Sequence, residues 1–188
     1  RYDIASRGVD LLEPYSRQHV TYIGNTIRGP VRRYCGLAKH AAGDLRGAID
    51  DLLMARNESR RIGDHLWDLA CSVDILEALA ESDPHRAIDL VPESIIVDAE
   101  ASEMKWRAHR GRVALTKARA SLARELGLSP RQIDVLNGLL KDLTINEIAQ
   151  NLGFSHSTVR QDSIAIYRTL HIAGRAAITD RARELHLL

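Results

Sequence analysis

The sequence predicts an all-α protein. Strand-forming runs of Val, Ile, Thr and Tyr are almost absent from its 188 residues, whereas Ala, Leu, Arg and Glu are abundant. Hydrophobic residues make up 45% of the chain and charged residues 27%, which is typical of a folded globular protein rather than a disordered one. The length suits two small domains, which we place at residues 1–126 and 127–188.

The first region is expected to contain helical hairpins. Residues 29–64 predict two helices joined at Gly43-Asp44. On the second of these helices Ala48, Leu52 and Ala55 recur at spacings of four and three, which places them on one face.

Three more helices are expected to follow in this region. Apolar residues from Leu66 to Leu79 lie at helical spacing and predict a helix over about 64–81. Asp83-Pro84 has the pattern of an N-cap followed by proline at the first helical position, and Pro92 should kink or split the helix that begins there. A further helix is expected from about Ser102 to Arg124.

Charge is unevenly distributed along these last segments. Residues 87–104 contain five acidic residues and no basic one, and residues 105–124 contain seven basic residues and no acidic one. We favour two adjacent antiparallel helices with complementary charged faces. The alternative is a basic helix that contacts DNA phosphates or an acidic partner surface.

The hairpins resemble the tetratricopeptide repeat (TPR). Gly36, Gly43, Ala48, Leu52 and Ala55 stand where that repeat has its small and apolar packing residues. The repeat's large aromatic residue and its closing proline are replaced here by Arg32 and Arg60. We therefore describe the region as TPR-like, with an unrelated α-helical bundle as the alternative.

The second region follows a hinge predicted at Gly127-Leu128. Ser129 is expected to cap a helix that starts with Pro130 and runs to about Lys141, and Gln132 can reach back to the backbone amide of the cap. The inward side chains of this helix are expected to be Ile133, Leu136, Leu139 and Leu140.

Three shorter helices should complete this region. Thr144 and Glu147 have the spacing of a second capping box, which opens a helix ending at Leu152. Gly153 can adopt the left-handed conformation that a tight turn requires. Ser155 then caps a helix over about 156–170, and a last helix covers about 175–187.

The middle pair of helices has the character of a helix-turn-helix. Ala149 permits a close approach, and Ile148, Leu152 and Val159 supply the apolar contact between the two helices. The outer face of the third helix is left with Ser157, Arg160, Gln161, Ile164 and Arg168. A helix presented in this way fits the major groove of DNA.

These motifs resemble the LuxR/GerE-type helix-turn-helix family across the whole last third of the chain. The matching segments are Leu128 to Arg131, Asp134 to Leu136, Thr144 with Glu147 to Ala149, Ser155 with Thr158 to Arg160, Ile166, Leu170 and Arg175. The resemblance implies four helices, DNA binding by the third and frequent dimerisation through the fourth. It places the DNA contacts on Thr158, Arg160, Gln161, Ile164 and Arg168, with backbone contacts near Thr144 and residues 155–157.

From this we assign roles to individual residues. Arg160 can form two hydrogen bonds to a guanine edge, Gln161 can do the same for adenine, and Ile164 can contact a thymine methyl group. The residues assigned to the DNA backbone are Thr144, Ser155, His156, Ser157, Thr158 and Arg168.

Two features count against strong DNA binding. The family usually has histidine where this chain has Asp162, and an acid close to phosphates weakens binding unless a basic group neutralises it. Residues 125–188 also carry seven Arg or Lys and seven Asp or Glu residues. We therefore expect a homodimer on double-stranded DNA, with two half-sites.

The N-terminal region has a looser resemblance. The segments from Leu11 to Tyr15, Ile23-Gly24, Gly29 to Val31, Tyr34, Gly36 and Gly43-Asp44 are similar to large regulators of the maltose-regulon activator (MalT-like, LAL-type) group. In that group an ATPase comes first, TPR-like helices follow and a LuxR-type domain ends the chain. The resemblance implies that this chain, which begins with Arg, is the C-terminal part of such a protein.

Other chemistry finds no support in the sequence. Because there is no phosphate-binding loop, no paired metal-ligand motif and no nucleophile arrangement, we expect no enzymatic activity, cofactor or metal site. Cys35 and Cys71 are expected to be buried free thiols in a cytoplasmic protein, and no apolar run reaches the ~20 residues of a membrane span. The alternative function is a protein-interaction module in which the TPR-like helices bind a partner and the helix-turn-helix serves dimerisation.

Overall fold

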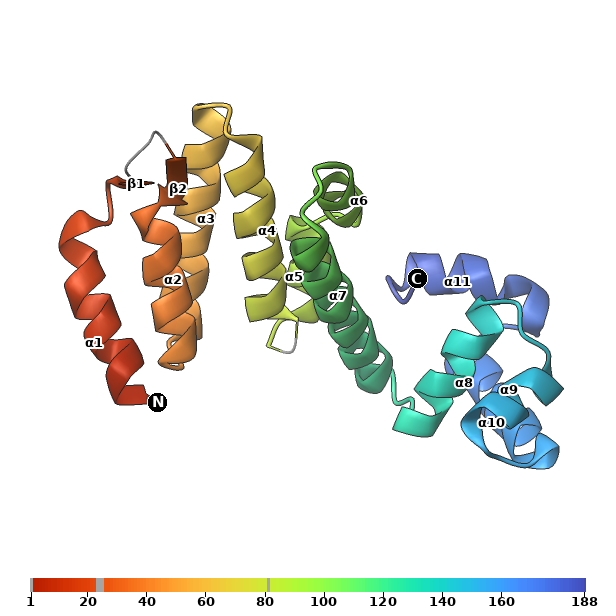
Figure 1. Ribbon diagram of the computed structural model, residues 1–188. Helices are drawn as coiled ribbons and strands as arrows, with labels where there is room; N and C mark the ends of the chain where they lie inside the picture. The colour runs from red at the N-terminus through yellow and green to blue at the C-terminus, as the bar shows by residue number, and fades with distance from the viewer. Residues whose placement is uncertain (1, 23–25, 81) are drawn as a thin grey trace. The chain divides into compact units, whose positions relative to one another are not determined.

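The computed structural model describes residues 2–22, 26–80 and 82–188, and its fold confirms the all-α class (Figure 1). The chain divides after residue 118 into two compact units, and the helix α7 runs from unit 1 into unit 2. The division therefore lies within a helix, ahead of the hinge predicted at Gly127. The helices are α1 (Tyr2–Leu12), α2 (Val31–Ala41), α3 (Leu45–Arg61), α4 (His65–Leu79), α5 (Pro84–Leu90), α6 (Ser94–Ala101), α7 (Lys105–Glu125), α8 (Pro130–Leu140), α9 (Ile145–Leu152), α10 (His156–Thr169) and α11 (Ile178–Glu184), with short 3-10 turns η1 (Glu13–Tyr15) and η2 (Arg175–Ala177).

The first four helices of unit 1 pack in sequence order. Each of α1, α2 and α3 contacts the next helix along the chain, so the helices form successive hairpins (Figure 1). The predicted joint at Gly43-Asp44 is confirmed, because Gly43 has a φ of 87° and the Asp44 carboxylate caps α3 by accepting from the Gly47 amide at 2.9 Å. These hairpins are compatible with the TPR-like interpretation, which stays a prediction.

The α2–α3 pair approaches closely at a glycine. A Cβ added to Gly36 would lie 2.8 Å from Cγ of Leu52 and 3.0 Å from the Ala48 carbonyl oxygen. Ala48, Leu52 and Ala55 are fully buried, so the predicted inner face of α3 is confirmed. Gly36 therefore lets the two helix backbones come together at the apolar stripe of α3.

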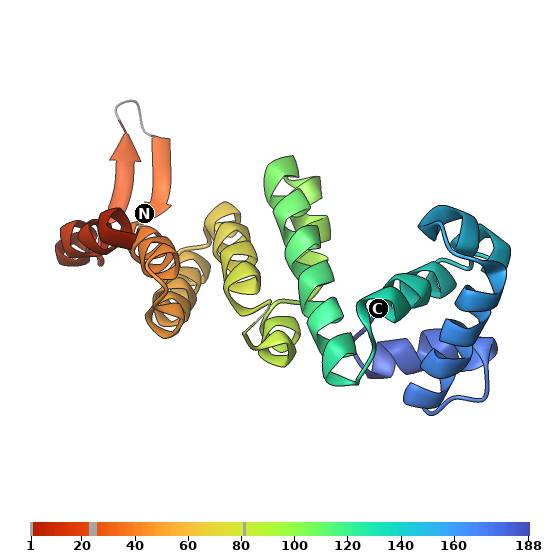
Figure 2. The same cartoon turned by 90° about the horizontal axis from the view of Figure 1, so that it is seen from below.

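A short hairpin, β1 (His19–Tyr22) and β2 (Thr26–Pro30), was not predicted. Its two strands pair antiparallel, with His19 opposite Pro30 and an irregularity between Val20 and Thr21. Figure 2 shows the hairpin standing at the N-terminal end of α2. The sequence does carry a sign of it, because Gly24-Asn25 is flanked by β-branched and aromatic residues.

The helices of the second half of unit 1 follow the predicted breaks. Asp64 and Asp83 cap α4 and α5 by accepting from the amides three residues later. Pro92 lies between α5 and α6, so it splits the segment as expected. The helix predicted from Ser102 instead begins at Lys105.

The core of unit 1 centres on α4, in which every residue from Leu69 to Leu76 is buried. The predicted burial of Cys35 and Cys71 is confirmed. Burial raises the pKa of the Cys71 thiol to about 12, so this group stays protonated and unreactive near neutral pH.

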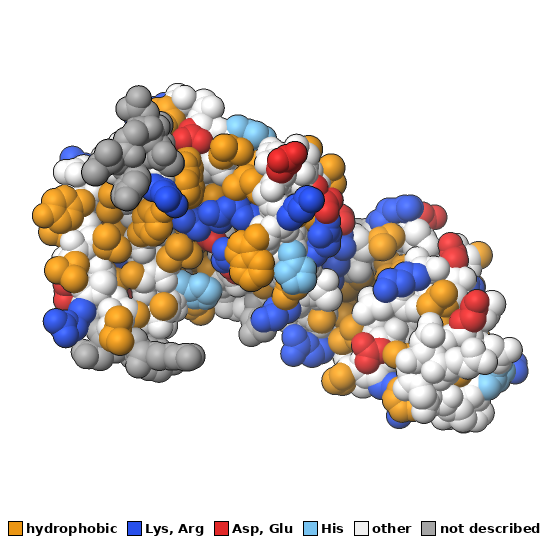
Figure 3. Space-filling model, in the orientation of Figure 1, with side chains coloured by type: hydrophobic (Ala, Val, Ile, Leu, Met, Phe, Trp, Pro, Cys, Tyr) orange, Lys and Arg blue, Asp and Glu red, His pale blue; other side chains and the backbone are white. Residues whose placement is uncertain are grey.

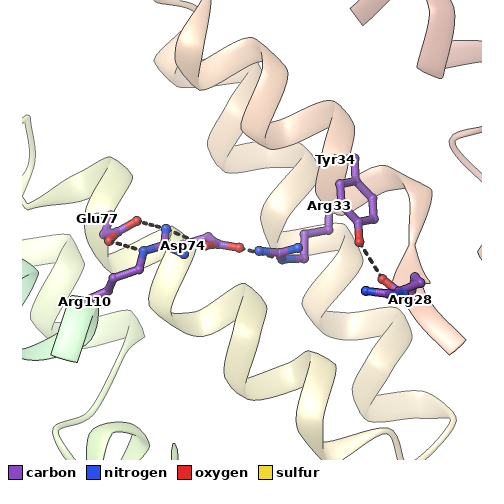
Figure 4. A network of polar contacts seen from close by, with 6 residues as sticks. All are labelled: Arg28, Arg33, Tyr34, Asp74, Glu77 and Arg110. Atoms are coloured by element: carbon purple, nitrogen blue, oxygen red, sulfur yellow. Dashed lines mark hydrogen bonds and ion pairs between the residues drawn. The ribbon is translucent and has the colours of Figure 1, made fainter. Parts of the chain in front are cut away.

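A buried carboxylate links α2, α4 and α7 (Figure 4). Asp74 on α4 accepts from Nε of Arg33 on α2 at 2.6 Å and from Arg110 on α7 at 3.0 Å. Arg110 also pairs with Glu77. Arg110 of the basic helix therefore finds its counter-charge on α4, and the predicted pairing with residues 87–104 is only partly right, through Arg112 and Glu100.

Unit 2 contains the end of α7 and the four predicted C-terminal helices. The last helix is shorter than predicted, because residues 175–177 form the turn η2 and α11 ends at Glu184. The pairs α8–α9, α8–α10, α9–α10 and α8–α11 are all in contact. A Cβ on Gly138 would lie 2.7 Å from Ile148, so glycine permits the close crossing of α8 and α9. Ile133, Leu136 and Leu139 are buried as predicted, whereas Leu140 is only partly buried.

Candidate nucleic-acid interface

Two capping boxes set where α8 and α9 begin, and both were predicted. The Ser129 hydroxyl accepts from the Gln132 amide, and the Gln132 side chain accepts from the Ser129 amide at 2.8 Å. Thr144 and Glu147 exchange the same pair of bonds. Hydrogen bonds from the Thr144 amide and hydroxyl hold the pKa of Glu147 below its ordinary value, so this carboxylate is ionised near neutral pH.

The turn between α9 and α10 also has the predicted form. Gly153 has a φ of 69°, in the left-handed region. The amide of Phe154 donates to the Ala149 carbonyl at 3.0 Å and closes the last turn of α9. Ser155 then caps α10 by accepting from the Thr158 amide at 3.1 Å.

The helix α10 has one inward and one outward face. Val159 and Ile166 are fully buried, as is Leu170 just after the helix. Besides His156 at its first position, its exposed residues are Ser157, Arg160, Gln161, Ile164 and Arg168, which recur every three or four positions along one side. Ile164 is 42% exposed, although it is apolar. The predicted outer face is thus confirmed as a surface.

The longer polar side chains on this face are free. In residues 119–188, all of which the structure describes, the side chains of Arg160, Gln161 and Arg168 have no hydrogen bond or ion pair. Two arginines and one amide are therefore available to a ligand without breaking an internal contact.

Hydroxyl groups gather at the N-terminus of α10. Oγ of Ser155 lies 2.9 Å from Oγ of Ser157 and 2.8 Å from Oγ1 of Thr158. The first amide groups of a helix have no acceptor within it and favour anions. In α10 these are the exposed residues His156 and Ser157, so donors surround this helix end.

Asp162 does not face outward, contrary to the expectation that it would lie close to phosphates. Its side chain is 6% exposed, and its oxygens accept from Nε and a terminal nitrogen of Arg131 at 2.7 and 3.1 Å. Arg131, at the start of α8, also lies over the ring of Phe154 at 5.8 Å. The only acidic residue of α10 is thus turned inward and neutralised, and the outward face carries positive charge alone.

The sequence did not predict that three arginines of this unit form internal hydrogen bonds. Besides Arg131, Arg175 donates to the Leu143 carbonyl at 2.8 Å and Arg181 to the Leu170 carbonyl at 3.1 Å. Arg131 and Arg175 stood in the motif, but a motif alone does not show which partner 31 or 32 residues away they meet.

Comparison with protein-family models finds a match to bacterial regulatory proteins of the luxR family over residues 126–182. Residues 126–182 are thus similar to the luxR family, and we refer to them as the LuxR-type domain. The match covers α8, α9, α10 and most of α11, so it contains the capping boxes, the turn and the outward face described above. The LuxR-type domain points to a DNA-binding transcription regulator.

No curated protein and no solved structure matched the chain in the same comparisons. The likeness of the N-terminal region to the MalT-like group therefore stays a prediction, as does its TPR-like character. In the described part of the chain, no group of three His, Cys, Asp or Glu residues is arranged to hold a metal ion. None of the helices there combines the length and apolar character needed to cross a bilayer.

Proposed function

We propose that the protein is a sequence-specific transcription regulator whose helix α10, the recognition helix, enters the major groove. The observation that carries this proposal is the outward face of α10, where Arg160 and Gln161 are exposed and without internal partners. Arg160 is proposed to read guanine, Gln161 adenine and Ile164 a thymine methyl group.

The hydroxyl-rich N-terminus of α10 is proposed to fix this helix on the DNA backbone. Ser155, His156, Ser157 and Thr158 would bind one phosphate through hydroxyl groups and unpaired amides. Arg168, three turns further along the helix, would bind another phosphate.

Thr144 is proposed as a backbone contact of a different kind. Its own amide and hydroxyl both donate to Glu147 at 2.7 Å, so neither is free for a phosphate. The contact would therefore come from the first amides of α9, at Ile145 and Asn146. The ionised Glu147 nearby makes this the weakest of the proposed contacts.

A homodimer is proposed as the binding form. The LuxR-type domain has no excess of positive charge, since residues 125–188 carry equal numbers of basic and acidic residues. Two copies on two half-sites would double the contacts, and the resemblance favours α11 as the dimerising helix. The helices of unit 1 are proposed to receive a signal through contact with another protein.

Selection of bound sites from random double-stranded DNA, at two salt concentrations, tests the DNA-binding role. A common half-site should be recovered with the 188-residue chain. Arg160→Ala should weaken binding to that site by about 1–3 kcal/mol, or roughly 5- to 150-fold, because a bidentate base contact is lost.

Arg61→Ala is the matched control, because Arg61 is an exposed arginine at the end of α3 and is not among the residues proposed to bind DNA or to dimerise. It removes the same charge outside the recognition helix and should leave the recovered half-site unchanged. Equal losses in both variants, or no DNA binding at low salt, would show that α10 does not read bases.

A further inference from the structure

Three helices of unit 1 begin at the same end of the unit, and each has a large planar side chain at its third residue. The N-terminal ends of α2, α4 and α7 lie together in Figure 1. Their third residues are Arg33, Trp67 and Arg107. The alignment of the three helices therefore brings two guanidinium groups to one indole.

These side chains form a stack. The guanidinium carbon of Arg33 lies 5.5 Å from the centre of the Trp67 ring, and that of Arg107 lies 5.7 Å from it. Both distances are within the range of a cation–π contact. Gly29 of β2 packs against the same ring, since a Cβ there would lie 2.5 Å from it. The indole is thus held in place from several sides.

The two arginines of the stack differ in their counter-charge. Arg33 donates to Asp74, and the neighbouring Arg110 donates to Asp74 and Glu77. Arg107 has no carboxylate partner among residues 2–22, 26–80 and 82–188. Burial, and then the charge of Arg33, lower the pKa of Arg107. A half-buried guanidinium whose donors are bonded to no carboxylate is the kind of group that a negatively charged ligand would complete.

A shallow pocket of about 320 Å³ opens beside Arg107. It is lined by Glu103, Met104, Lys105, Trp106, Arg107 and Arg110. Trp106 is 70% exposed, and its ring stacks on that of His109 with centroids 6.3 Å apart. Figure 3 shows hydrophobic, basic and histidine side chains side by side on one face of unit 1. The pocket thus combines positive charge with an exposed indole.

We propose that this pocket binds an acidic peptide segment of a partner protein. A carboxylate of the segment would accept from the donors of Arg107, which can hold it in two parallel bonds, and an apolar residue beside it would pack on Trp106. Charge complementarity favours this occupant, because Lys105 and Arg107 line the pocket with one acidic residue, Glu103, and Arg110 is already paired with carboxylates on α4. The shallow shape favours a peptide over a small molecule, which needs most of its surface enclosed.

The proposal deepens the proposed role of unit 1 in contacting another protein, and it does not depend on DNA binding by α10. Its test uses the 188-residue chain and an array of eight-residue peptides, each with a central Asp or Glu among varied apolar residues. A matched array carries Asn or Gln at the same positions. A subset of the acidic peptides should bind, and their amide counterparts should bind roughly tenfold or more weakly.

Variants then connect this binding to the pocket. Arg107→Gln and Trp106→Ala should each weaken it by roughly tenfold. Arg107→Lys keeps the charge but loses the planar pair of donors, so its peptide affinity should lie between those of the unchanged chain and of Arg107→Gln. The control is Arg112→Gln, which changes an exposed arginine on the same helix that already pairs with Glu100 and should bind normally. Far-ultraviolet circular dichroism checks that each variant is folded.

Other outcomes would overturn the proposal. Equal binding of acidic and amide peptides would show that the carboxylate does not contribute to binding. Normal binding by folded Arg107→Gln would show that the peptides bind at another site. The same variants are titrated with the selected DNA half-site. If Arg107→Gln weakens DNA binding and no acidic peptide binds, the pocket belongs to the nucleic-acid interface. If Arg160→Ala alone weakens DNA binding while the peptides bind, the two sites are separate.

Discussion

Arg131 and Asp162 form an ion pair whose two side chains are unequally exposed. The Arg131 side chain is 50% exposed, whereas that of Asp162 is 6% exposed. Removal of the arginine leaves a carboxylate inside the domain without its donors. Removal of the carboxylate only returns the arginine to solvent, which can hydrate it.

We therefore predict that Arg131→Met destabilises the protein more than Asp162→Asn. A buried polar group left without its partner costs about 1–3 kcal/mol, and this cost falls on Asp162 in Arg131→Met alone. Urea denaturation followed by circular dichroism measures the difference. Equal losses would mean that the pair does not hold α10 against α8 in the way its burial indicates.

At the scale of single residues, local spacing predicted the outward face of α10 well. Arg160, Gln161 and Arg168 are exposed because positions three and four apart share a side of a helix. The orientation of Asp162 was not predictable, because its partner lies 31 residues away. The same holds for the stack at Trp67, whose two arginines lie on other helices.

Among the elements, the pair α2–α3 depends on a glycine that has no room for a side chain. A Cβ at Gly36 would press on the buried Leu52 and on a backbone carbonyl. Gly8, in the middle of α1, would place its Cβ at an ordinary 3.9 Å from Ala38. Substitution by alanine can therefore be compared at a tight helix contact, Gly36, and at a position with room for a methyl group, Gly8.

Gly36→Ala and Gly8→Ala should change stability in opposite directions. In α1, alanine should add about 0.5–1 kcal/mol because it favours the helix. In α2, the overpacking of a tight core should cost about 1–3 kcal/mol and outweigh that gain. Thermal and urea denaturation of the two variants measure both effects. If Gly36→Ala is stabilising, α2 and α3 can move apart with little loss of folding free energy.

Helix boundaries were predicted where local chemistry decides them. The capping boxes at Ser129 and Thr144, the turn at Gly153 and the break at Pro92 each depend on a few neighbouring residues. The β1–β2 hairpin was missed because its two strands are short and the composition of the whole chain favours helices. The counter-charges of α7 were only partly predicted, because Arg112 pairs with Glu100 in the neighbouring segment but Arg110 pairs with Asp74 and Glu77 on α4.

For the whole molecule, the balance of charge predicts that DNA affinity depends only weakly on salt concentration. The net charge is only +1, and the outward face of α10 carries two arginines. Affinity should fall with a slope of about −0.9 on a logarithmic salt scale for each phosphate neutralised. One copy is proposed to bind about two phosphates, one at the N-terminus of α10 and one at Arg168, because Arg160 is assigned to a base.

The slope on a single half-site should therefore be roughly −2, and two half-sites spaced by about one helical turn should give roughly twice that value. Fluorescence anisotropy of labelled DNA, titrated with the chain at several salt concentrations, provides both slopes. A single half-site bound as tightly and with the same slope as the paired one would contradict the proposed homodimer.

The positions of the two tryptophans have a practical consequence. Trp67 and Trp106 both belong to unit 1, and the LuxR-type domain contains no indole at all. Tryptophan fluorescence, excited selectively at the long-wavelength edge of protein absorption, will thus report on unit 1 and not on the recognition helix. Peptide binding to unit 1 and DNA binding by the recognition helix can then be followed separately in one sample. Tryptophan fluorescence reports the first, and a dye on the DNA reports the second.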